Sequence, residues 1–406
     1  MGYKKDVIKG VSLTGFLRLT TKLVGFLETI ILARILAPEQ FGTYGIALLA
    51  LGLLETITQT GVNIVLVQEK ETDKYVSSAW IVSVLRGIII TLLLLLATPY
   101  IASFFHSPSS VILLYSISIV PLLRGFINPA VVKLQKELLF AKNFWYQMII
   151  LVTDTAISII ITYLTKNPIG IVIGLLAGVI IELVLSYIIV SPRPTLQFEK
   201  AYISKIFHRG KWVTATAVFD YLFFNIDNIA VGRILGASSL GIYQLAYSLA
   251  VIPLVELGNV FGYVMFPIFT KLSKDRKQLK DAYVKTFLMV VVLSIPVVII
   301  FVTFPHFFVF ILGKKWSAIA TVLPILSLLG FVKGIAGLSN ALFWSEIKQR
   351  YVTVITFATI AGMLATLFTF INHFGIVGAG ISALIGSLLA IPFIIYYTTK
   401  LLFPSK

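Results

Sequence analysis

The sequence predicts an all-α polytopic membrane protein with about twelve transmembrane helices, and its composition and hydropathy pattern are the reasons. Of the 406 residues, 58% are hydrophobic and only 12% are charged, and the mean hydropathy is +0.98. Soluble domains carry roughly a quarter charged residues, so this chain lacks the polar surface that a soluble protein needs. Long apolar runs recur along the whole chain, which excludes disorder and also excludes a soluble enzyme with a single anchor.

The apolar runs have the length of helices that cross a bilayer, which need about 20 residues each. Transmembrane strands would instead give segments of roughly ten residues with alternating polarity. Spans are predicted near residues 11–33, 43–65, 78–98, 110–131, 145–164, 168–190, 212–231, 240–267, 285–312, 318–343, 351–371 and 376–397. The first apolar stretch is full length and lacks a small-residue cleavage site, so we expect it to be retained as a span.

The distribution of Lys and Arg predicts the orientation. With both termini in the cytoplasm, 23 of the 33 basic residues fall on the cytoplasmic side, 5 fall outside and 5 lie within spans. This bias follows the positive-inside rule, so we expect a multi-pass protein of the inner or plasma membrane with both termini cytoplasmic. The same rule accounts for the net charge of +16 without a nucleic-acid partner.

An internal repeat predicts two lobes. Residues 33–47 read ARILAPEQFGTYGIA and residues 232–246 read GRILGASSLGIYQLA, and at a constant shift of 199 six of the fifteen positions agree. Glu28 and Asp227 also align at this shift, whereas Arg124 and Lys333 align at a shift of 209. Six crossings return a chain to its starting side, so the prediction is two parallel six-helix lobes, 1–200 and 201–406, around a central cavity. Such repeats are typical of transporters.

The hairpin RILAPEQFGTYGIA, its echo RILGASSLGIYQLA and the twelve-span layout resemble the polysaccharide exporter branch of the multidrug/oligosaccharidyl-lipid/polysaccharide flippase superfamily. The resemblance covers the whole chain. It implies a flippase that moves polyprenyl-pyrophosphate-linked sugar repeat units across the inner membrane for O-antigen, capsule or exopolysaccharide assembly. It also implies that the partners are the lipid-linked glycan, membrane lipids, a polysaccharide polymerase and other assembly proteins. Many members of this branch carry two further C-terminal spans beyond the twelve predicted here.

Cations inside the spans predict a site for the anionic head group. A charge in a span costs about 2.5 kcal/mol or more, so each one needs a reason. Arg18 and Lys22 lie four residues apart on one face of the first span, and Lys333 lies near the middle of the tenth span with Asn340 on its face. Charge-assisted donors suit a pyrophosphate, although Arg18 and Lys22 could instead snorkel to the inner surface. The predicted site comprises Arg18, Lys22, Arg86, Arg124, Lys333 and Asn340, of which Arg86 and Arg124 are also open to snorkelling.

Acids inside the spans predict a site for a coupling ion. Asp220 and Asp227 are seven residues apart, two turns along one face of the seventh span, and Glu28 is the repeat equivalent of Asp227. Two carboxylates in a low dielectric cannot both stay ionised cheaply, so one takes a proton or the two share a cation. The coupling ion would then be H⁺ or Na⁺. The alternative is that these acids form an intramembrane ion pair with a cation of another helix, such as Lys333.

Catalytic, metal and nucleotide sites are not expected. There is no Cys, and the four His residues are scattered near span ends without metal-ligand spacing. The glycines at 170, 174 and 178 repeat every four residues and predict close helix packing. We therefore expect a transporter without a cofactor rather than an enzyme. The alternatives are a cation-coupled multidrug antiporter, whose cavity should favour acids, and a membrane polysaccharide polymerase or ligase, which would need a sizeable outside loop.

Overall fold

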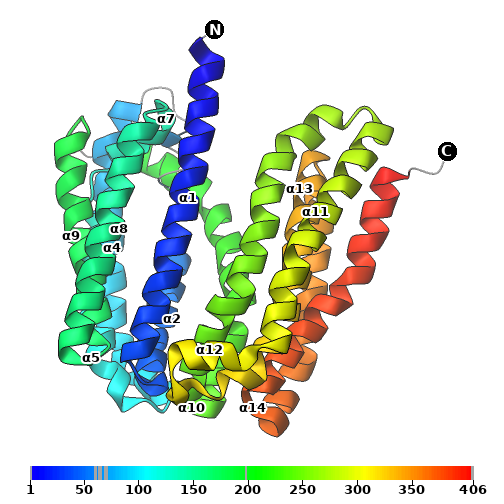
Figure 1. The fold of residues 1–406 in the computed structure, drawn as a ribbon. Coiled ribbons are helices and arrows are strands. Elements are labelled where there is room, and N and C mark those ends of the chain that lie inside the picture. Colours follow the sequence, from blue (N-terminus) through cyan, green and yellow to red (C-terminus); the bar gives the residue numbers. More distant parts are fainter. Residues whose placement is uncertain (1, 59–61, 63–65, 68–71, 197–198, 404–406) are drawn as a thin grey trace. The chain divides into compact units, whose positions relative to one another are not determined.

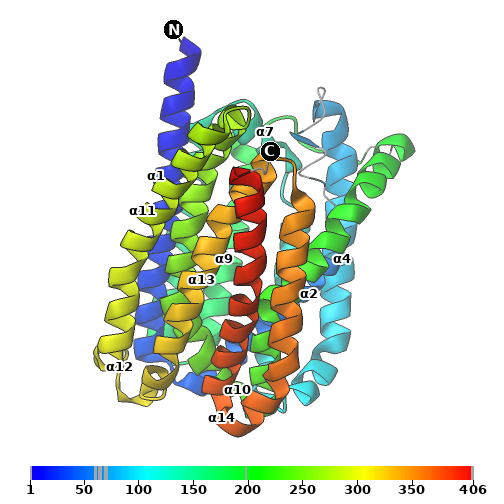
Figure 2. The ribbon, with the colours of Figure 1, turned by 90° about the vertical axis from the view of Figure 1, so that its right-hand side faces the viewer.

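The computed structural model describes residues 2–58, 62, 66–67, 72–196 and 199–403, and the regular elements in these ranges are all helices (Figures 1 and 2). The chain divides into two compact units, Met1–Phe224 and Asn225–Lys406. Helix α10 runs through the boundary between them, so the lobe boundary predicted near residue 200 stays a prediction.

Unit 1 is built from long helices joined by short turns. Its elements are α1 (Gly2–Ile35), α2 (Pro38–Ile57), α4 (Thr72–Phe104), η1 (Pro108–Ser110), α5 (Val111–Ile117), α6 (Ile119–Gly125), η2 (Pro129–Val132), α7 (Lys133–Lys136), α8 (Phe140–Thr165) and α9 (Ile169–Ile189). Helix α2 starts with Pro38 at its first helical position, where a missing N–H costs nothing. The span predicted over 110–131 is divided into α5 and α6 at Ser118, because Pro121 cannot donate the hydrogen bond that would continue the first helix.

Unit 2 holds most of α10 (Lys200–Leu272), then α11 (Arg276–Thr303), α12 (Pro305–Leu312), η3 (Lys314–Trp316), α13 (Ile319–Ser345) and α14 (Gln349–Leu402). Helices α10 and α14 each contain two predicted spans, joined at Gly236 (φ 83°) and Gly375 (φ 59°). Only glycine adopts these backbone angles readily, so each glycine makes the turn between two spans. The span predicted over 285–312 is present as α11 but ends earlier than predicted, at Thr303. Pro305 starts a separate helix there after Phe304 leaves the helical conformation.

The helix count agrees with the sequence prediction once these turns are considered. Within the described residues, nine helices are long and apolar enough to cross a membrane, and α10 and α14 are two of them. Dividing those two at their glycines gives eleven crossing segments, and α1 occupies the position of the first predicted span. The chain is therefore a polytopic helical membrane protein.

Glycines bring helices into close contact in both units. In unit 1, Gly174 and Gly178 of α9 pack on Ser158 and Asp154 of α8, where an added Cβ would lie 2.6 Å and 2.9 Å from the respective Cβ atoms. The packing role predicted for these glycines is thereby confirmed. In unit 2, Gly258 of α10 meets the backbone of Gly334 on α13 with no room for a side chain. This contact holds the central part of α13, which carries Lys333, against α10.

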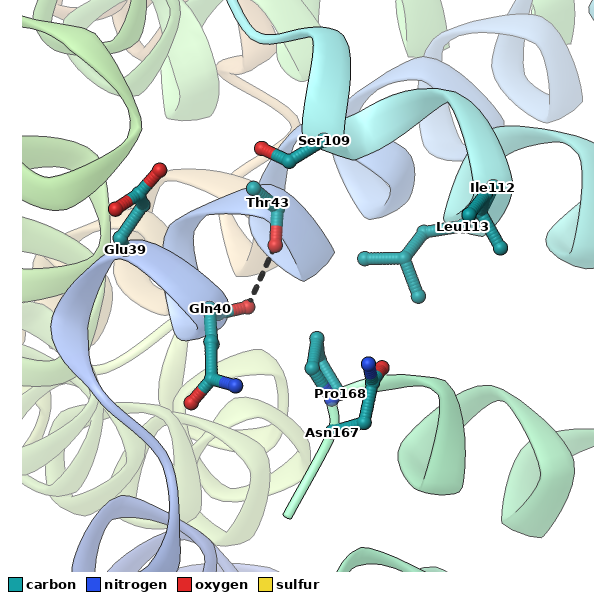
Figure 3. A pocket seen from close by; sticks show the side chains of 8 residues that line it. All are labelled: Glu39, Gln40, Thr43, Ser109, Ile112, Leu113, Asn167 and Pro168. Atoms are coloured by element: carbon teal, nitrogen blue, oxygen red, sulfur yellow. Dashed lines mark hydrogen bonds between the residues drawn. The ribbon is translucent and has the colours of Figure 1, made fainter. Parts of the chain in front are cut away.

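Three turns predicted to lie outside the membrane come together in unit 1. They precede α2, α5 and α9, and residues in or directly after each of them line one pocket (Figure 3). Helix α7 lies at the opposite end of unit 1, together with the start of α1 (Figure 1). The alternation of turns predicted from the basic residues is thus reproduced within this unit, and the side of the membrane stays a prediction.

Topology reporters test which side of the membrane each turn faces. We expect fusions after Lys74, Lys142 or Lys280 to report the cytoplasm, because their segments carry the excess of basic residues. A reporter inserted between Phe104 and Ser109 should report the outside. Paired alkaline phosphatase and fluorescent protein fusions measure this directly, and a cytoplasmic signal from the last insertion would contradict the predicted order of spans.

Candidate functional site

Lys333 lies near the middle of α13, where it is half-buried beside Tyr247 of α10. Its Nζ atom donates a hydrogen bond to the Tyr247 hydroxyl at 3.1 Å and lies 5.5 Å from the centre of the Tyr247 ring. The phenol therefore supports the lysine charge through its hydroxyl oxygen, which accepts a charge-assisted hydrogen bond. An ammonium group held at this depth in a membrane helix has the chemistry needed to bind an anion.

Asp227 belongs to the same group of polar side chains. It is only 2% exposed, and its carboxylate accepts hydrogen bonds from the Tyr243 hydroxyl (2.9 Å), the Asn228 backbone N–H (2.8 Å) and the Asn228 side-chain amide (3.1 Å). The Tyr243 and Tyr247 rings lie 6.4 Å apart, and Asp227 attracts Lys333 electrostatically. We call Asp227, Asn228, Tyr243, Tyr247 and Lys333 the unit 2 charge cluster.

Unit 1 repeats part of this arrangement with a second acid, and Arg124, which aligns with Lys333 at the shift of 209, acts electrostatically on Tyr44 and Asp154. The Glu28 carboxylate accepts a hydrogen bond from the Thr155 hydroxyl at 3.0 Å, and Glu28 and Asp154 interact electrostatically with each other and with Tyr44. Glu28 and Tyr44 are the repeat equivalents of Asp227 and Tyr243. We call Glu28, Tyr44, Asp154 and Thr155 the unit 1 acid cluster. All four side chains are half-buried.

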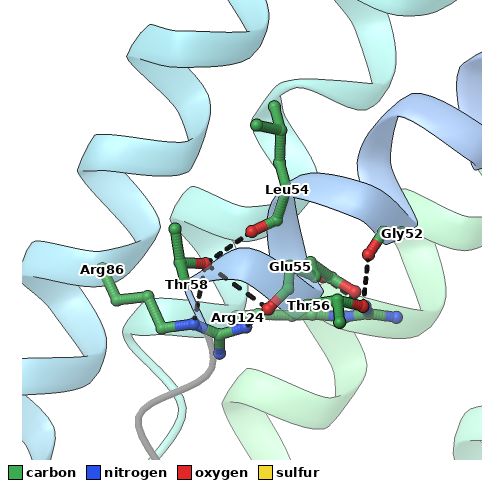
Figure 4. A network of polar contacts seen from close by, with 7 residues as sticks. All are labelled: Gly52, Leu54, Glu55, Thr56, Thr58, Arg86 and Arg124. Carbon is green, nitrogen blue, oxygen red and sulfur yellow. Dashed lines mark hydrogen bonds and ion pairs between the residues drawn. The ribbon is translucent and has the colours of Figure 1, made fainter. Parts of the chain in front are cut away.

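Arg86 and Arg124 meet around Glu55, at the end of α2 (Figure 4). The Arg86 guanidinium donates to the Glu55 backbone oxygen (2.7 Å) and to the Thr58 hydroxyl (3.2 Å), so it satisfies one of the last carbonyl groups of the helix. Arg124 forms an ion pair with the Glu55 carboxylate at 2.8 Å and also attracts Asp154 and Glu182. The geometry accounts for Arg86 as a helix-capping residue and surrounds Arg124 with acids of its own unit.

The other predicted site residues are distributed between the units. Lys22 is exposed on α1. Asn340 is half-buried on α13, and its side-chain oxygen has no hydrogen-bond partner among the described residues. The side chains of Arg18 and Asp220 lie outside the described part of the structure. Within units, the structure therefore brings together Asp227 with Lys333 and Arg86 with Arg124.

Sequence reasoning missed the two tyrosines that hold the unit 2 charge cluster together. Tyr243 is one of the six positions that match in the repeat, and Tyr247 follows it by one helical turn, so both share a face of α10. That pattern could have identified them. In the described ranges no three His, Asp or Glu side chains are grouped as metal ligands.

Comparison with known sequences gives one family match and several relatives. A family profile described as polysaccharide biosynthesis protein matches residues 31–321. The lipopolysaccharide biosynthesis protein WzxC of Escherichia coli (strain K12) is 23% identical over 352 residues, which cover 86% of this chain and 72% of that protein. The succinoglycan biosynthesis transport protein ExoT of Rhizobium meliloti (strain 1021) is 25% identical over 358 residues, with coverage of 84% and 72%.

Comparison with solved structures shows a shared fold. The lipid II flippase MurJ in its inward closed conformation matches with a TM-score of 0.73 at 16% identity, covering 95% of this chain and 87% of that one. An inward-facing multidrug resistance MATE family transporter of the MOP superfamily matches with a TM-score of 0.70 at 16% identity, covering 94% of each chain. The all-helical fold predicted from the sequence is confirmed.

Proposed function

Because the chain belongs to the polysaccharide biosynthesis protein family, we propose that it is a flippase for polyprenyl-pyrophosphate-linked oligosaccharides in O-antigen, capsule or exopolysaccharide synthesis. The relatives WzxC and ExoT are named for lipopolysaccharide biosynthesis and succinoglycan transport, respectively. The chain is a transporter rather than an enzyme, so the polymerase or ligase alternative is set aside. A polysaccharide polymerase and other assembly proteins are its proposed partners.

The unit 2 charge cluster is the observation that carries this proposal. A pyrophosphate offers several anionic oxygens, and a half-buried ammonium gives it charge-assisted hydrogen bonds that are stronger than neutral ones. Lys333 donates to the Tyr247 hydroxyl at 3.1 Å, and Asp227 attracts it electrostatically, so its charge is held in place within the cluster. In contrast, Arg86 caps a helix and Arg124 is paired with Glu55. Lys333 is therefore our proposed head-group residue, with Asn340 on the same helix offering an amide.

The unit 1 acid cluster is our proposed site for the coupling ion. Glu28 and Asp154 repel each other when both are ionised, and a proton or Na⁺ removes that repulsion. Asp227, in comparison, has three hydrogen-bond donors and the nearby positive charge of Lys333. This favours the ion-pair alternative for Asp227 and leaves Glu28 as the repeat-related acid that can take up an ion. Ion binding at the unit 1 acid cluster would drive the conformational change that exposes the head-group site to one side of the membrane and then to the other.

A cation-coupled multidrug antiporter is the second candidate, and the unit 1 acid cluster is the observation that favours it. Its half-buried carboxylates could attract a cationic drug as well as a coupling ion. The unit 2 charge cluster argues against this candidate, because Lys333 would repel a cation.

Transport by the purified full chain in liposomes separates the two candidates. We expect faster flipping of a fluorescent polyprenyl-pyrophosphate oligosaccharide, measured as protection from a membrane-impermeant quencher, when a H⁺ or Na⁺ gradient is imposed. A fluorescent short-chain phospholipid and ethidium serve as control substrates. Transport of ethidium without flipping of the glycan lipid would refute the flippase and support the antiporter.

A further inference from the structure

Unit 1 contains a pocket that the proposed function does not use. It has a volume of about 310 Å³ and lies between α2, the start of α5 and the turn before α9 (Figure 3). Its lining residues are Glu39, Gln40, Thr43, Ser109, Ile112, Leu113, Asn167 and Pro168. Binding pockets for small molecules measure roughly 300–1,000 Å³, so the space suits a ligand of the size of a sugar ring. All three segments are predicted to face the outside.

The lining combines hydrogen-bonding groups with an apolar surface. Glu39 is exposed and presents a carboxylate, whose two oxygens can accept hydrogen bonds from two neighbouring hydroxyl groups. The Asn167 oxygen is occupied by the Ile169 N–H at 2.9 Å, which leaves the amide NH₂ as a donor. Ile112, Leu113 and Pro168 supply C–H surface for the apolar face of a ring.

The charge of the lining selects against anions. None of the eight lining residues is basic. The nearby Lys166 ammonium lies 3.9 Å over the Tyr163 ring. The Glu39 carboxylate repels phosphate and carboxylate groups, so the lining favours an uncharged group over the pyrophosphate end of a glycan lipid. The remaining class is an uncharged ligand rich in hydroxyl groups.

The internal repeat allows the polar lining to be compared with the equivalent hairpin of unit 2. At the shift of 199, the residues that match between the two hairpins include Arg34, Gly42 and Tyr44. The lining residues Glu39, Gln40 and Thr43 instead correspond to Ser238, Ser239 and Ile242. The unit 2 hairpin forms helices on both sides of Gly236 without these groups. Gln40 has a structural role, since it accepts a hydrogen bond from the Ala37 N–H (2.9 Å) and donates one to the Lys166 backbone oxygen (2.9 Å), and Thr43 donates to the Gln40 backbone oxygen (2.8 Å). Of the three, Glu39 is the side chain that these contacts do not use.

We propose that this pocket binds an uncharged sugar ring of the translocated glycan on the outside face. The inference rests on the proposed function, since it assigns the pocket to the same substrate at a second position, away from the head-group residue Lys333. Hydroxyl groups of the sugar donate to Glu39 and accept from Asn167 while the ring packs on Ile112 and Leu113. Binding there holds the glycan outside and opposes its return.

Saturation-transfer difference NMR on the full chain in nanodiscs tests the pocket, with methyl glucoside, methyl N-acetylglucosaminide and methyl glucuronide as probes. We expect signals from the two neutral sugars and a weaker signal from the glucuronide. Glu39→Ser, which introduces the residue of the second repeat, should lower the neutral-sugar signals about tenfold because it removes a charged hydrogen-bond acceptor. Glu39→Gln should raise the glucuronide signal relative to the neutral sugars, since the repulsion is gone.

Three controls separate this inference from the proposed function. Ser238→Ala, at the equivalent position of unit 2, should leave the sugar signals unchanged, whereas Ile112→Trp should fill the pocket and abolish them. Lys333→Ala should slow flipping strongly but retain the sugar signals. Equal signals in the wild type, Glu39→Ser and Ile112→Trp would overturn the pocket, and so would the absence of a signal from every neutral sugar. A wild-type chain that binds sugars here but fails to flip the glycan lipid would refute the proposed function alone.

Discussion

Replacing Lys333 with alanine is expected to slow flipping of the glycan lipid by about 10- to 150-fold, because a charge-assisted hydrogen bond contributes about 1.5–3 kcal/mol. The ammonium is half-buried, and it is the cation of the unit 2 charge cluster. Removing it should not unfold the protein, since Asp227 keeps its three hydrogen bonds from Tyr243 and Asn228. Initial flipping rates in liposomes, normalised to membrane abundance, measure the effect.

Conservative and matched variants show whether the charge is responsible. Lys333→Arg retains the charge and should keep part of the activity. Lys348→Ala, which removes an exposed lysine between α13 and α14, should have no effect. Arg18→Ala should also block flipping, as the cation stripe of the first span predicts. Full activity of Lys333→Ala at normal abundance would remove Lys333 from the head-group site.

The change Asp227→Asn is expected to destabilise the protein by about 1–3 kcal/mol, since it removes the negative charge opposite Lys333 and weakens a charged hydrogen bond from Tyr243. A fully buried ion pair would lose more when one partner is removed, but Lys333 is only half-buried. Thermal denaturation of the solubilised protein and its abundance in the membrane measure the loss. The double variant Asp227→Asn with Lys333→Met should recover most of the stability, because no isolated charge is left.

The repeat supplies a matched variant for this experiment. Glu28→Gln changes the equivalent position of unit 1, where a second acid, Asp154, interacts with Glu28 and is itself attracted by Arg124. We expect it to remove the dependence of flipping on the ion gradient while the protein stays folded, because it abolishes the repulsion that ion binding relieves. If flipping by a folded Asp227→Asn protein no longer depends on the ion gradient while flipping by Glu28→Gln still does, then Asp227, and not Glu28, is the coupling residue.

The sequence by itself determined the features that depend on one helix at a time. Hydropathy and length predict the helical membrane fold, and the glycines at 170, 174 and 178 predict that the helix carrying them packs closely on another helix. The shift of 199 is enough to identify Glu28 and Asp227 as equivalent positions of the repeat. The breaks at Pro121 and Pro305 were missed because both lie in apolar stretches, where hydropathy does not register a lost backbone hydrogen bond.

Only the tertiary structure decided which side chains meet. Lys333 and Tyr247 are 86 residues apart, Glu28 and Thr155 are 127 apart, and Arg124 and Glu55 are 69 apart. Helical periodicity states which residues share a face of their own helix, but the partner of that face depends on which helices pack together and in what register. For the same reason Arg86 could be assigned to capping α2, and the pocket beside Glu39 could be found, only after the helices of unit 1 had been placed against one another.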